Sequence, residues 1–343
     1  MSGIDWINTI QQSIHELFTN YSELHISTVN RLDQLPGALQ FYRSYVSCNI
    51  PCILSNLCNS WLVSHWNILY LRQLIGNTVI SVSITPNGLA DSILSCTRNH
   101  TKYFVTPYTV SMCYNQFVDL VDHTSNAVHC RYYIPNAIYY AQQQNNCFNT
   151  EYSTLHQYIS ESKLMNDVFD TPPDAVNLWI GNALSVSSLH RDMYENIYSV
   201  VSGRKIFYLY PPVSYHYLQF SYYHTAQFVP KRLITDPSLP YIELTDERYS
   251  EWCILPDINN SRIPWSDWDA SKYDASIHSI HLKPLTVTLY PGDTLYLPSQ
   301  WYHQVHQSDD TIAINYWYDM KYDIKYCYSE FMKSISHIQQ HNK

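Results

Sequence analysis

The sequence predicts a mainly β fold of the α+β class, in which a sandwich or barrel of antiparallel strands is flanked by helices. Three observations carry this prediction. Short strand-like runs crowd the second half of the chain, helical patterns of apolar residues lie toward its two ends, and hydrophobic residues make up 45% of its 343 residues. That apolar fraction is sufficient for a full core and excludes a disordered chain.

Residues 1–173 are predicted to form a mixed α/β region that packs on the barrel. Its first helix is indicated by apolar residues at helical spacing, and two more helices are expected over 39–46 and 66–74. Strand-like runs at 51–54 and 79–84 alternate with these helices, so the region can donate extra strands to the barrel. The apolar stripe of the first helix consists of Ile7, Ile10, Ile14, Leu17 and Phe18.

Residues 174–318 carry most of the predicted strands and are expected to form the barrel. Leu285, Val287 and Leu289 alternate with other residues, which is the period-2 pattern of a half-buried strand. Gly292 follows Pro291 and supplies the permissive backbone that a tight turn between two strands needs. The strand-like runs span 176–180, 196–201, 205–210, 285–290, 294–297, 301–305 and 311–317.

One long segment, 215–280, interrupts the strand pattern. It has little periodicity and carries prolines at positions 230, 237, 240, 256 and 264. We therefore expect it to lack regular structure. Within a compact domain, an insert of this length usually has a functional or covering role.

Residues 319–343 are predicted to form a C-terminal helix. Spacing alone favours packing of this helix and of the first one on the domain, although a dimer interface would explain the same apolar stripes. The stripe of the last helix consists of Tyr328, Phe331, Met332, Ile335 and Ile338.

Composition excludes several functional classes. The net charge of −9, from 20 Lys and Arg against 29 Asp and Glu, argues against a nucleic-acid binder, which needs a basic patch. The chain has 7 glycines, and none of them is placed to form a Gly-x-Gly fingerprint, a P-loop or a Gly-x-Ser-x-Gly elbow. The absence of these glycine patterns excludes the common nucleotide-binding and serine-hydrolase motifs.

The 9 cysteines include no Cys-x-x-Cys pair, so neither a zinc knuckle nor a dense disulfide framework is expected. The N-terminus has no basic segment followed by an apolar run, and no stretch of about 18 uncharged apolar residues occurs. Free thiols without a secretory signal predict a reducing compartment, the cytoplasm, with access to the nucleus left open. No association with a membrane is expected.

The first candidate site is the pair His190 and Asp192. Side chains at i and i+2 of a strand leave it on the same face, and nitrogen plus carboxylate suits a mixed-ligand divalent metal. His303, in another predicted strand, can complete the two-histidine, one-carboxylate triad of non-haem Fe(II) oxygenases. His306 lies at an odd offset from His303 and is expected on the opposite face. In a chain with 16 histidines, the alternative is a chance pairing.

Three polar residues fall at inward-facing positions of predicted strands. Lys205 shares a face with Phe207 and Leu209, and a buried lysine is costly unless it pairs with an anion. A dicarboxylate cosubstrate would supply that anion, whereas the alternative is an edge-strand lysine whose stem reaches solvent. Asn196 and Asn315 can bond a carboxylate near the metal or satisfy a buried backbone group.

Several sequence runs around these residues resemble the JmjC oxygenases, and in particular their small, hydroxylase-type members. The runs are SLHRDMYENIY at 188–198, VVSGRK at 200–205, YPGDTLYLP at 290–298 and WYHQV at 301–305. Two more, DAVNLWIG at 174–181 and NYWYDM at 315–320, resemble the lysyl hydroxylases of that family. The resemblance covers nearly the whole chain and is most specific after residue 174.

The resemblance implies a double-stranded β-helix, which is a jelly-roll or cupin-like barrel, and a set of cofactor residues. His190, Asp192 and His303 would hold Fe(II), and O2 would bind at the same metal. Lys205 would pair with the distal carboxylate of the cosubstrate 2-oxoglutarate, and Tyr140 would hydrogen-bond that carboxylate.

The same resemblance implies three more site residues. Ser187 stands where relatives often have threonine, although strict strand alternation does not place it on the face of the metal ligands. Asn196 and Asn315 would flank the metal-side carboxylate of 2-oxoglutarate. Tyr139 is an alternative to Tyr140, because the two are adjacent in a tyrosine-rich stretch.

The function implied by the resemblance is Fe(II)- and 2-oxoglutarate-dependent protein hydroxylation. The implied reaction is (3S)-lysyl hydroxylation of developmentally regulated GTP-binding proteins, and a homodimer formed through the terminal helices is expected. An acidic surface would favour a basic substrate segment. No general base is needed for such chemistry, because the cofactors carry the oxidation.

Three other functions stay open: a JmjC lysine demethylase, a tRNA-base hydroxylase, and a cupin-like binding protein without turnover. Demethylases usually carry chromatin-reading modules, and none is recognisable in the sequence. A net charge of −9 is unfavourable for RNA, and the intact set of metal and cosubstrate residues argues against a protein without turnover. Peptidase activity has been proposed for relatives, but no Ser/His/Asp or Cys/His arrangement is recognisable.

Overall fold

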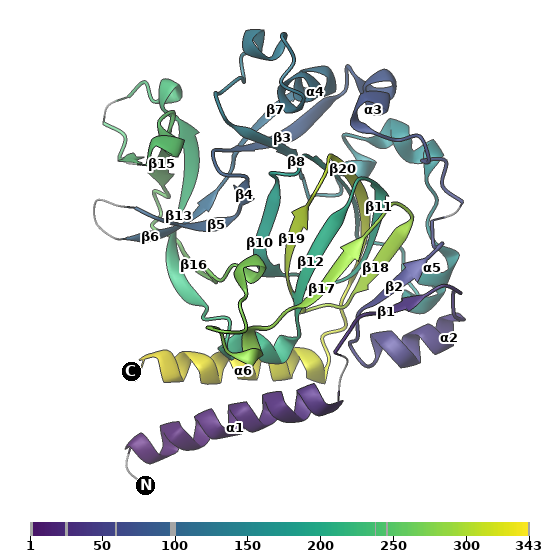
Figure 1. Cartoon of the computed structure of the whole chain (residues 1–343), viewed down its shortest axis with the longest axis vertical. Helices are drawn as coiled ribbons and strands as arrows, with labels where there is room; N and C mark the ends of the chain where they lie inside the picture. Colours follow the sequence, from purple (N-terminus) through teal and green to yellow (C-terminus); the bar gives the residue numbers. More distant parts are fainter. Residues whose placement is uncertain are drawn as a thin grey trace.

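The computed structural model describes residues 3–24, 27–58, 60–96, 101–236, 238–244 and 246–341, and it leaves out the side chains at 3–5, 7 and 337–341. A β barrel occupies the centre of the molecule, and the last helix, α6 (Ile324–His341), runs beneath it beside the first helix, α1 (Gly3–Leu24) (Figure 1). No helix within the described ranges is both long and apolar enough to cross a bilayer.

The barrel consists of two facing sheets in which early and late strands interleave. In both sheets every neighbouring pair of barrel strands is antiparallel, and this interleaving confirms the predicted jelly-roll barrel. One sheet has the order β18 (Asp293–Leu297), β11 (Tyr194–Ser202), β20 (Thr311–Asp319) and β9 (Ala175–Gly181). The other has the order β17 (Leu285–Leu289), β12 (Lys205–Tyr210), β19 (Tyr302–Gln307) and β10 (Val186–Arg191).

Strand alternation fills the inside of the barrel with apolar side chains. Phe207 and Leu209 of β12 and Val287 and Leu289 of β17 are buried in one cluster. Gly292 has the positive φ of 91° that the turn between β17 and β18 requires. Lys205 precedes Phe207 on the same face and is only 1% exposed, so the predicted inward lysine is fully buried.

The N-terminal region extends the barrel at its edges. Arg31 of β1 pairs with the carboxylate of Asp293 on β18, which ties this region to the barrel. On one edge of the first sheet β2 (Cys52–Ser55) pairs with β18 and β1 (Asn30–Leu32) follows, and on the other lie β8 (Ile138–Ala141), β3 (Val79–Thr85) and β7 (Tyr108–Cys113). The two-residue strand β4 (Leu89–Ala90) pairs with β10 of the second sheet.

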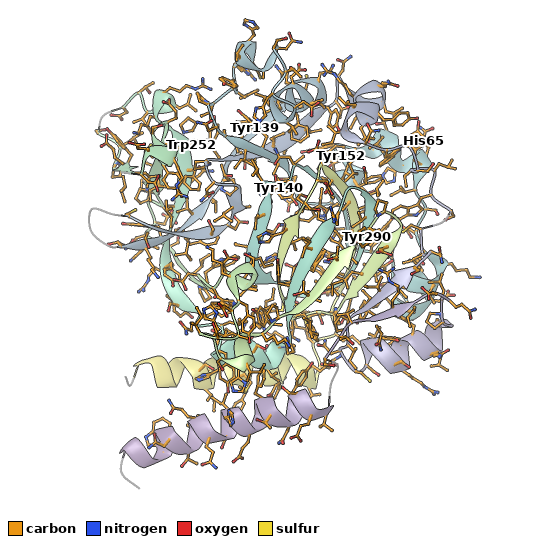
Figure 2. The ribbon with its side chains drawn as sticks, viewed as in Figure 1. His65, Tyr139, Tyr140, Tyr152, Trp252 and Tyr290 are labelled. Atoms are coloured by element: carbon orange, nitrogen blue, oxygen red, sulfur yellow. The ribbon has the colours of Figure 1, made fainter. Side chains whose placement is uncertain are left out.

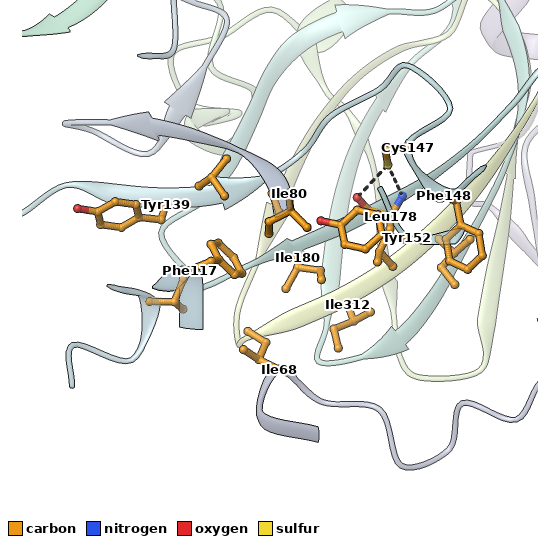
Figure 3. Close-up of a cluster of buried hydrophobic side chains, with 14 of the residues drawn as sticks. Ile68, Ile80, Phe117, Tyr139, Cys147, Phe148, Tyr152, Leu178, Ile180 and Ile312 are labelled. Carbon is orange, nitrogen blue, oxygen red and sulfur yellow. Dashed lines mark hydrogen bonds between the residues drawn. The ribbon is translucent and has the colours of Figure 1, made fainter. Parts of the chain in front are cut away.

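Helices cover the outer face of the first sheet. Ile80 of β3, Ile180 of β9 and Ile312 of β20 form a buried cluster with Ile68 of α3 and Phe117 of α4 (Figure 3). Burial of such side chains is the main source of stability here, at roughly 25 cal/mol for each Å² of apolar surface. The helices of this region are α2 (Ala38–Phe41), which continues into a π-helical turn (Tyr42–Val46), α3 (Ile68–Ile75), α4 (Tyr114–Val121) and α5 (Lys163–Phe169).

The segment 215–280 is not the irregular insert that the sequence predicted. Its strands join two N-terminal strands in a third sheet, and its longest strand, β13, pairs in parallel with β6. Pro230 and Pro256 lie at strand ends and Pro264 on an edge strand, where a missing N–H is tolerated, whereas Pro240 lies in a loop and Pro237 outside the described residues. This sheet contains β14 (Ile242–Glu243), β15 (Trp252–Pro256), β13 (Ser221–Pro230), β6 (Lys102–Thr106), β5 (Ser92–Ser95) and β16 (Arg262–Trp265).

The two terminal helices bury only part of their apolar stripes. Ile14 of α1 and Met332 of α6 are buried, whereas Phe331 of α6 is 58% exposed. Phe18 of α1 makes edge contacts with the rings of Tyr217 and His281. The side chains of the remaining stripe members at 7 and 338 lie outside the described residues. Packing on the domain therefore accounts for the inner residues of the stripes but leaves Phe331 uncovered.

Candidate metal centre

The three predicted metal ligands lie together near one end of the barrel. His190 of β10 is directly opposite His303 of β19 in the antiparallel pairing, and Asp192 follows the end of β10. The Oδ2 atom of Asp192 lies 3.6 Å from Nε2 of His303 and 3.9 Å from Nε2 of His190. All three ligand atoms lie within 4.8 Å of one another, so a single ion placed between them can bind all three.

Both histidines are oriented by backbone carbonyls. Nδ1 of His190 lies 2.7 Å from the carbonyl oxygen of Ser188, and Nδ1 of His303 lies 3.0 Å from that of Trp301. Because a carbonyl only accepts, each Nδ1 donates and each Nε2 presents a lone pair toward Asp192. Burial and then the neighbouring His190 lower the pKa of His303 to about 4, which keeps it neutral.

This donor set fits Fe(II). Two neutral imidazole nitrogens and one carboxylate oxygen, presented from one side, form the facial arrangement of non-haem iron oxygenases and leave the opposite positions open. The predicted triad is thus brought together by the fold. His306 is not part of the triad. Its Nε2 lies 2.7 Å from Nε2 of Gln304. Gln304 directly follows His303 on β19, so Gln304 and His306 both point to the opposite face of the strand.

A β-bulge brings Ser187 to the same cavity. In the pairing of β10 with β19, the four residues from Ser187 to His190 oppose the three from His303 to Val305, so the register shifts by one. The shift overrides the strict alternation that argued against Ser187. As a result its side chain lines the cavity with His190 and Tyr140. Burial raises the pKa of the Tyr140 phenol, and the neighbouring Ser187 lowers it by less.

Lys205 lies in an uncharged, fully buried environment. Its Nζ donates to the hydroxyl of Tyr140 at 3.2 Å and to Oε1 of Gln307, and burial lowers its pKa to about 7. Among the described residues no carboxylate pairs with it. A buried lysine bonded only to neutral acceptors is well suited to receive the carboxylate of an anionic ligand.

Gly181 allows the groups around Lys205 to approach closely. A Cβ atom at this position would come within 2.7 Å of both Gln307 Nε2 and Tyr140 Cδ2. Gln307 is held further by donation from its Nε2 to the carbonyl of Asn182, which directs Oε1 toward Lys205. Sequence analysis missed Gln307, although strand alternation from His303 on β19 already places it on the inward face.

The two predicted asparagines occupy different positions. Asn196 lines the cavity, and its Oδ1 accepts from Nδ2 of Asn315 at 3.1 Å. Asn315 is completely buried, and its Oδ1 accepts from Nε1 of Trp179 at 2.8 Å. These two hydrogen bonds fix the amide of Asn196 so that its Nδ2 is available to the cavity. Asn315 therefore supports Asn196 and does not itself line the cavity.

One narrow cavity connects the metal ligands with Tyr140, which contacts Lys205. Tyr140 and Tyr139 are adjacent on β8 (Figure 2), but the hydroxyl of Tyr139 bonds the backbone at Tyr132 and Ile134 instead. The position of the Tyr139 hydroxyl therefore does not support the alternative in which Tyr139, rather than Tyr140, binds the cosubstrate. The apolar walls of the cavity are formed by Trp179, Tyr198, Phe207, Val305 and Trp317.

A second, wider pocket of about 410 Å³ shares His190 with this cavity. The segment 215–280 contributes part of its walls, including the aromatic side chains of Tyr215, Phe220 and Trp265. Arg191 lines it together with residues of α6. The segment 215–280 and α6 therefore shape the pocket that lies beside the metal centre.

Comparisons with known proteins agree with this geometry. The family model described as a cupin-like domain matches residues 38–324. The chain is 33% identical over 346 residues to lysine-specific demethylase JMJ32 of Arabidopsis thaliana, covering 94% of this chain and 91% of that protein. It is 35% identical over 341 residues to JmjC domain-containing protein E of Dictyostelium discoideum, covering 93% and 92%. It is 32% identical over 308 residues to the human bifunctional peptidase and (3S)-lysyl hydroxylase JMJD7, covering 89% and 88%.

Proposed function

This chain belongs to the JmjC family of cupin-like proteins, and from that premise we propose that it is an Fe(II)- and 2-oxoglutarate-dependent lysyl hydroxylase of proteins. JmjC proteins are oxygenases that use Fe(II) and 2-oxoglutarate. One observation carries the proposal: the His190, Asp192 and His303 triad shares a cavity with Tyr140, which accepts a hydrogen bond from the buried Lys205. That combination provides a metal site and, close to it, a site for an anion.

In this proposal His190, Asp192 and His303 bind the iron, and Lys205 with Tyr140 binds the distal carboxylate of 2-oxoglutarate. Ser187 supports Tyr140, and Gln307 holds the ammonium of Lys205 without neutralising it. Asn196 donates to the carboxylate nearer the metal. Bound iron, 2-oxoglutarate and O2 supply the oxidising chemistry. The aromatic walls exclude water, so the residues of the chain mainly position the reactants.

The human relative named as a (3S)-lysyl hydroxylase supports lysine as the target. We extend the proposal to a GTP-binding protein as the substrate and to a cytoplasmic location, with nuclear access left open. A homodimer through the terminal helices is also proposed, because Phe331 and Ile324 of α6 are 58% and 79% exposed. Light scattering of the purified protein tests the last point.

Mass spectrometry tests the reaction. A lysine-containing peptide from a GTP-binding protein is incubated with the protein, Fe(II) and 2-oxoglutarate, and the expected product has gained one oxygen on lysine. The Asp192→Ala variant serves as the control, and it should leave the peptide unchanged. Turnover of 2-oxoglutarate without oxygen on any lysine peptide would reject the substrate class, and absence of all turnover would reject the oxygenase.

A second candidate activity is lysine demethylation, which the name of the Arabidopsis relative favours. A twin of the same peptide with a methylated lysine separates the two reactions. A hydroxylase adds oxygen to the unmodified lysine, whereas a demethylase removes the methyl group and releases formaldehyde. Loss of methyl from the twin at a higher kcat/KM than hydroxylation of the unmodified peptide would replace our proposal with the demethylase.

The affinity for 2-oxoglutarate is expected to fall as the pH rises above about 7. Burial lowers the pKa of Lys205 to about 7 in the free protein, and the carboxylate binds the protonated ammonium, so binding above this pH requires uptake of a proton. The dissociation constant should increase by up to about tenfold per pH unit. Isothermal titration calorimetry in buffers of different ionisation enthalpy measures both effects, and an affinity that does not change with pH would contradict them.

A further inference from the structure

The first two metal ligands flank a charged residue that points away from the metal. Arg191 lies between His190 and Asp192 and is the last residue of β10. Because neighbouring side chains of a strand point to opposite faces, Arg191 lies on the outer face of its sheet while His190 faces the cavity. The side chain of Arg191 is nevertheless only 9% exposed. A charged side chain buried to this extent needs partners that hold it.

The last helix, α6, which runs beneath the barrel (Figure 1), supplies those partners. Nη1 of Arg191 donates to Oγ of Ser329 at 2.6 Å, and its Nη2 lies 3.3 Å from Oε1 of Glu330. Ser329 is itself buried. A planar guanidinium that donates to two acceptors is held in a more narrowly defined position than a group with a single bond. The end of β10 is therefore attached to α6 at two points.

The same side chain also contacts the strand of the third ligand. Arg191 is paired with Tyr302 in the antiparallel ladder of β10 and β19, directly beside the pairing of His190 with His303. Its guanidinium carbon lies 5.5 Å from the centroid of the Tyr302 ring, which is within the range of a cation–π contact. Tyr302 is fully buried. Arg191 thus contacts α6 and β19 together, on the face of the sheet opposite the two histidine ligands.

Asp192 depends on this attachment more than the two histidines do. His190 and His303 lie within paired strands, whereas Asp192 lies beyond the end of β10. Its carbonyl accepts a hydrogen bond from the amide of Gln300 at 2.9 Å, and the residue before it is the anchored Arg191. Asp192 supplies the one carboxylate of the triad. A shift of the strand end would therefore displace the anionic ligand of the ion.

We propose that Arg191 is a positioning residue through which α6 fixes the end of β10 and keeps Asp192 in place for the metal. This inference rests on the metal centre of the proposed function, and it gives the C-terminal helix a role in metal binding. The role of Arg191 is indirect, since the atoms that can hold one ion come from His190, Asp192 and His303. Glu330 has a second effect, because its charge offsets that of the Arg191 guanidinium close to a bound cation.

Binding of Mn(II) tests the proposal without turnover. Mn(II) accepts imidazole and carboxylate ligands as Fe(II) does, and its free concentration is read by electron paramagnetic resonance. Dissociation constants are measured for the full-length wild type, for Arg191→Met, and for an α6 variant that carries Ser329→Ala and Glu330→Ala together. All measurements are made at a temperature at which circular dichroism shows each protein to be folded.

The matched control is Arg31→Met. It makes the same substitution in an ion pair that joins β1 to β18 and shares no residue with the triad or its cavity. A general loss of stability would therefore affect the control as well, whereas a loss of ligand positioning would not.

We expect Arg191→Met and the α6 variant each to weaken Mn(II) binding by about tenfold to about a hundredfold, and Arg31→Met to stay within about twofold of wild type. Combining Arg191→Met with the α6 substitutions should cause no further loss, because both changes break the same contact. An affinity of Arg191→Met within about twofold of wild type overturns the proposal, as do an equal loss in Arg31→Met and additive losses in the combined protein. A wild type that binds no Mn(II) would reject the metal centre of the proposed function, and this inference with it.

Discussion

Replacing Asp192 by alanine is expected to lower the rate of 2-oxoglutarate oxidation on the order of a thousandfold or more. The substitution removes the only anionic ligand of the triad, and two neutral imidazoles at 3.6 Å and 3.9 Å from the missing oxygen hold Fe(II) poorly. Formation of succinate and the iron content of the purified variant measure the effect together. Succinate formation and iron content should both fall to the background measured in a sample without protein.

The fold should survive this substitution. The side chain of Asp192 is 21% exposed and its charged contacts are the two histidines, so the midpoint of thermal unfolding of the metal-free protein should stay within a few degrees of wild type. Asp309→Ala, which removes a surface partner of Arg204, is the matched control with normal turnover. Full iron-dependent activity in Asp192→Ala would show that the triad is wrongly assigned.

Replacing Lys205 by methionine is expected to raise the KM for 2-oxoglutarate by about two orders of magnitude or more, with a smaller effect on kcat. Loss of a buried charge partner costs an anionic ligand about 2–5 kcal/mol. Methionine retains most of the volume of the lysine stem, so no large cavity forms. Steady-state kinetics with varied 2-oxoglutarate separates the two parameters, and titration calorimetry gives the affinity directly.

The same variant should be at least as stable as wild type near neutral pH. Lys205 is buried among uncharged groups, and burial lowers its pKa from 10.5 to about 7, so in the unfolded chain it binds a proton more readily than in the folded protein. This difference in proton binding opposes folding at any pH below about 10.5 and reaches its full size below about pH 7, and methionine removes that penalty. Lys272→Met, at a residue with a 79% exposed side chain, is the control. A normal KM in Lys205→Met would exclude this residue from cosubstrate binding.

Strand alternation accounts for what could be predicted of the barrel. The inward set of Lys205, Phe207 and Leu209 follows from a period of two. The spacing of His190 and Asp192 likewise predicted that their side chains lie together, and the structure places them within reach of one ion with His303. These are local properties of one strand each, which is why the sequence alone carried them.

The parts that could not be predicted depend on contacts between distant segments. A bulge in the pairing of β10 with β19 turns Ser187 inward, and a bulge has no signature in alternation. The third sheet forms because β13 pairs with β6, more than a hundred residues earlier in the chain, and its prolines misled the prediction.

The most direct test of the whole account is the origin of the new oxygen. The lysine peptide is incubated with the protein, Fe(II) and 2-oxoglutarate under isotopically heavy O2 in ordinary water, and the products are weighed by mass spectrometry. We predict one heavy oxygen on the lysine and one in the succinate for each hydroxylation, since the metal centre divides one O2 between them. A hydroxyl oxygen derived from water, or hydroxylation without 2-oxoglutarate, would contradict the assignment of this site as an oxygenase centre.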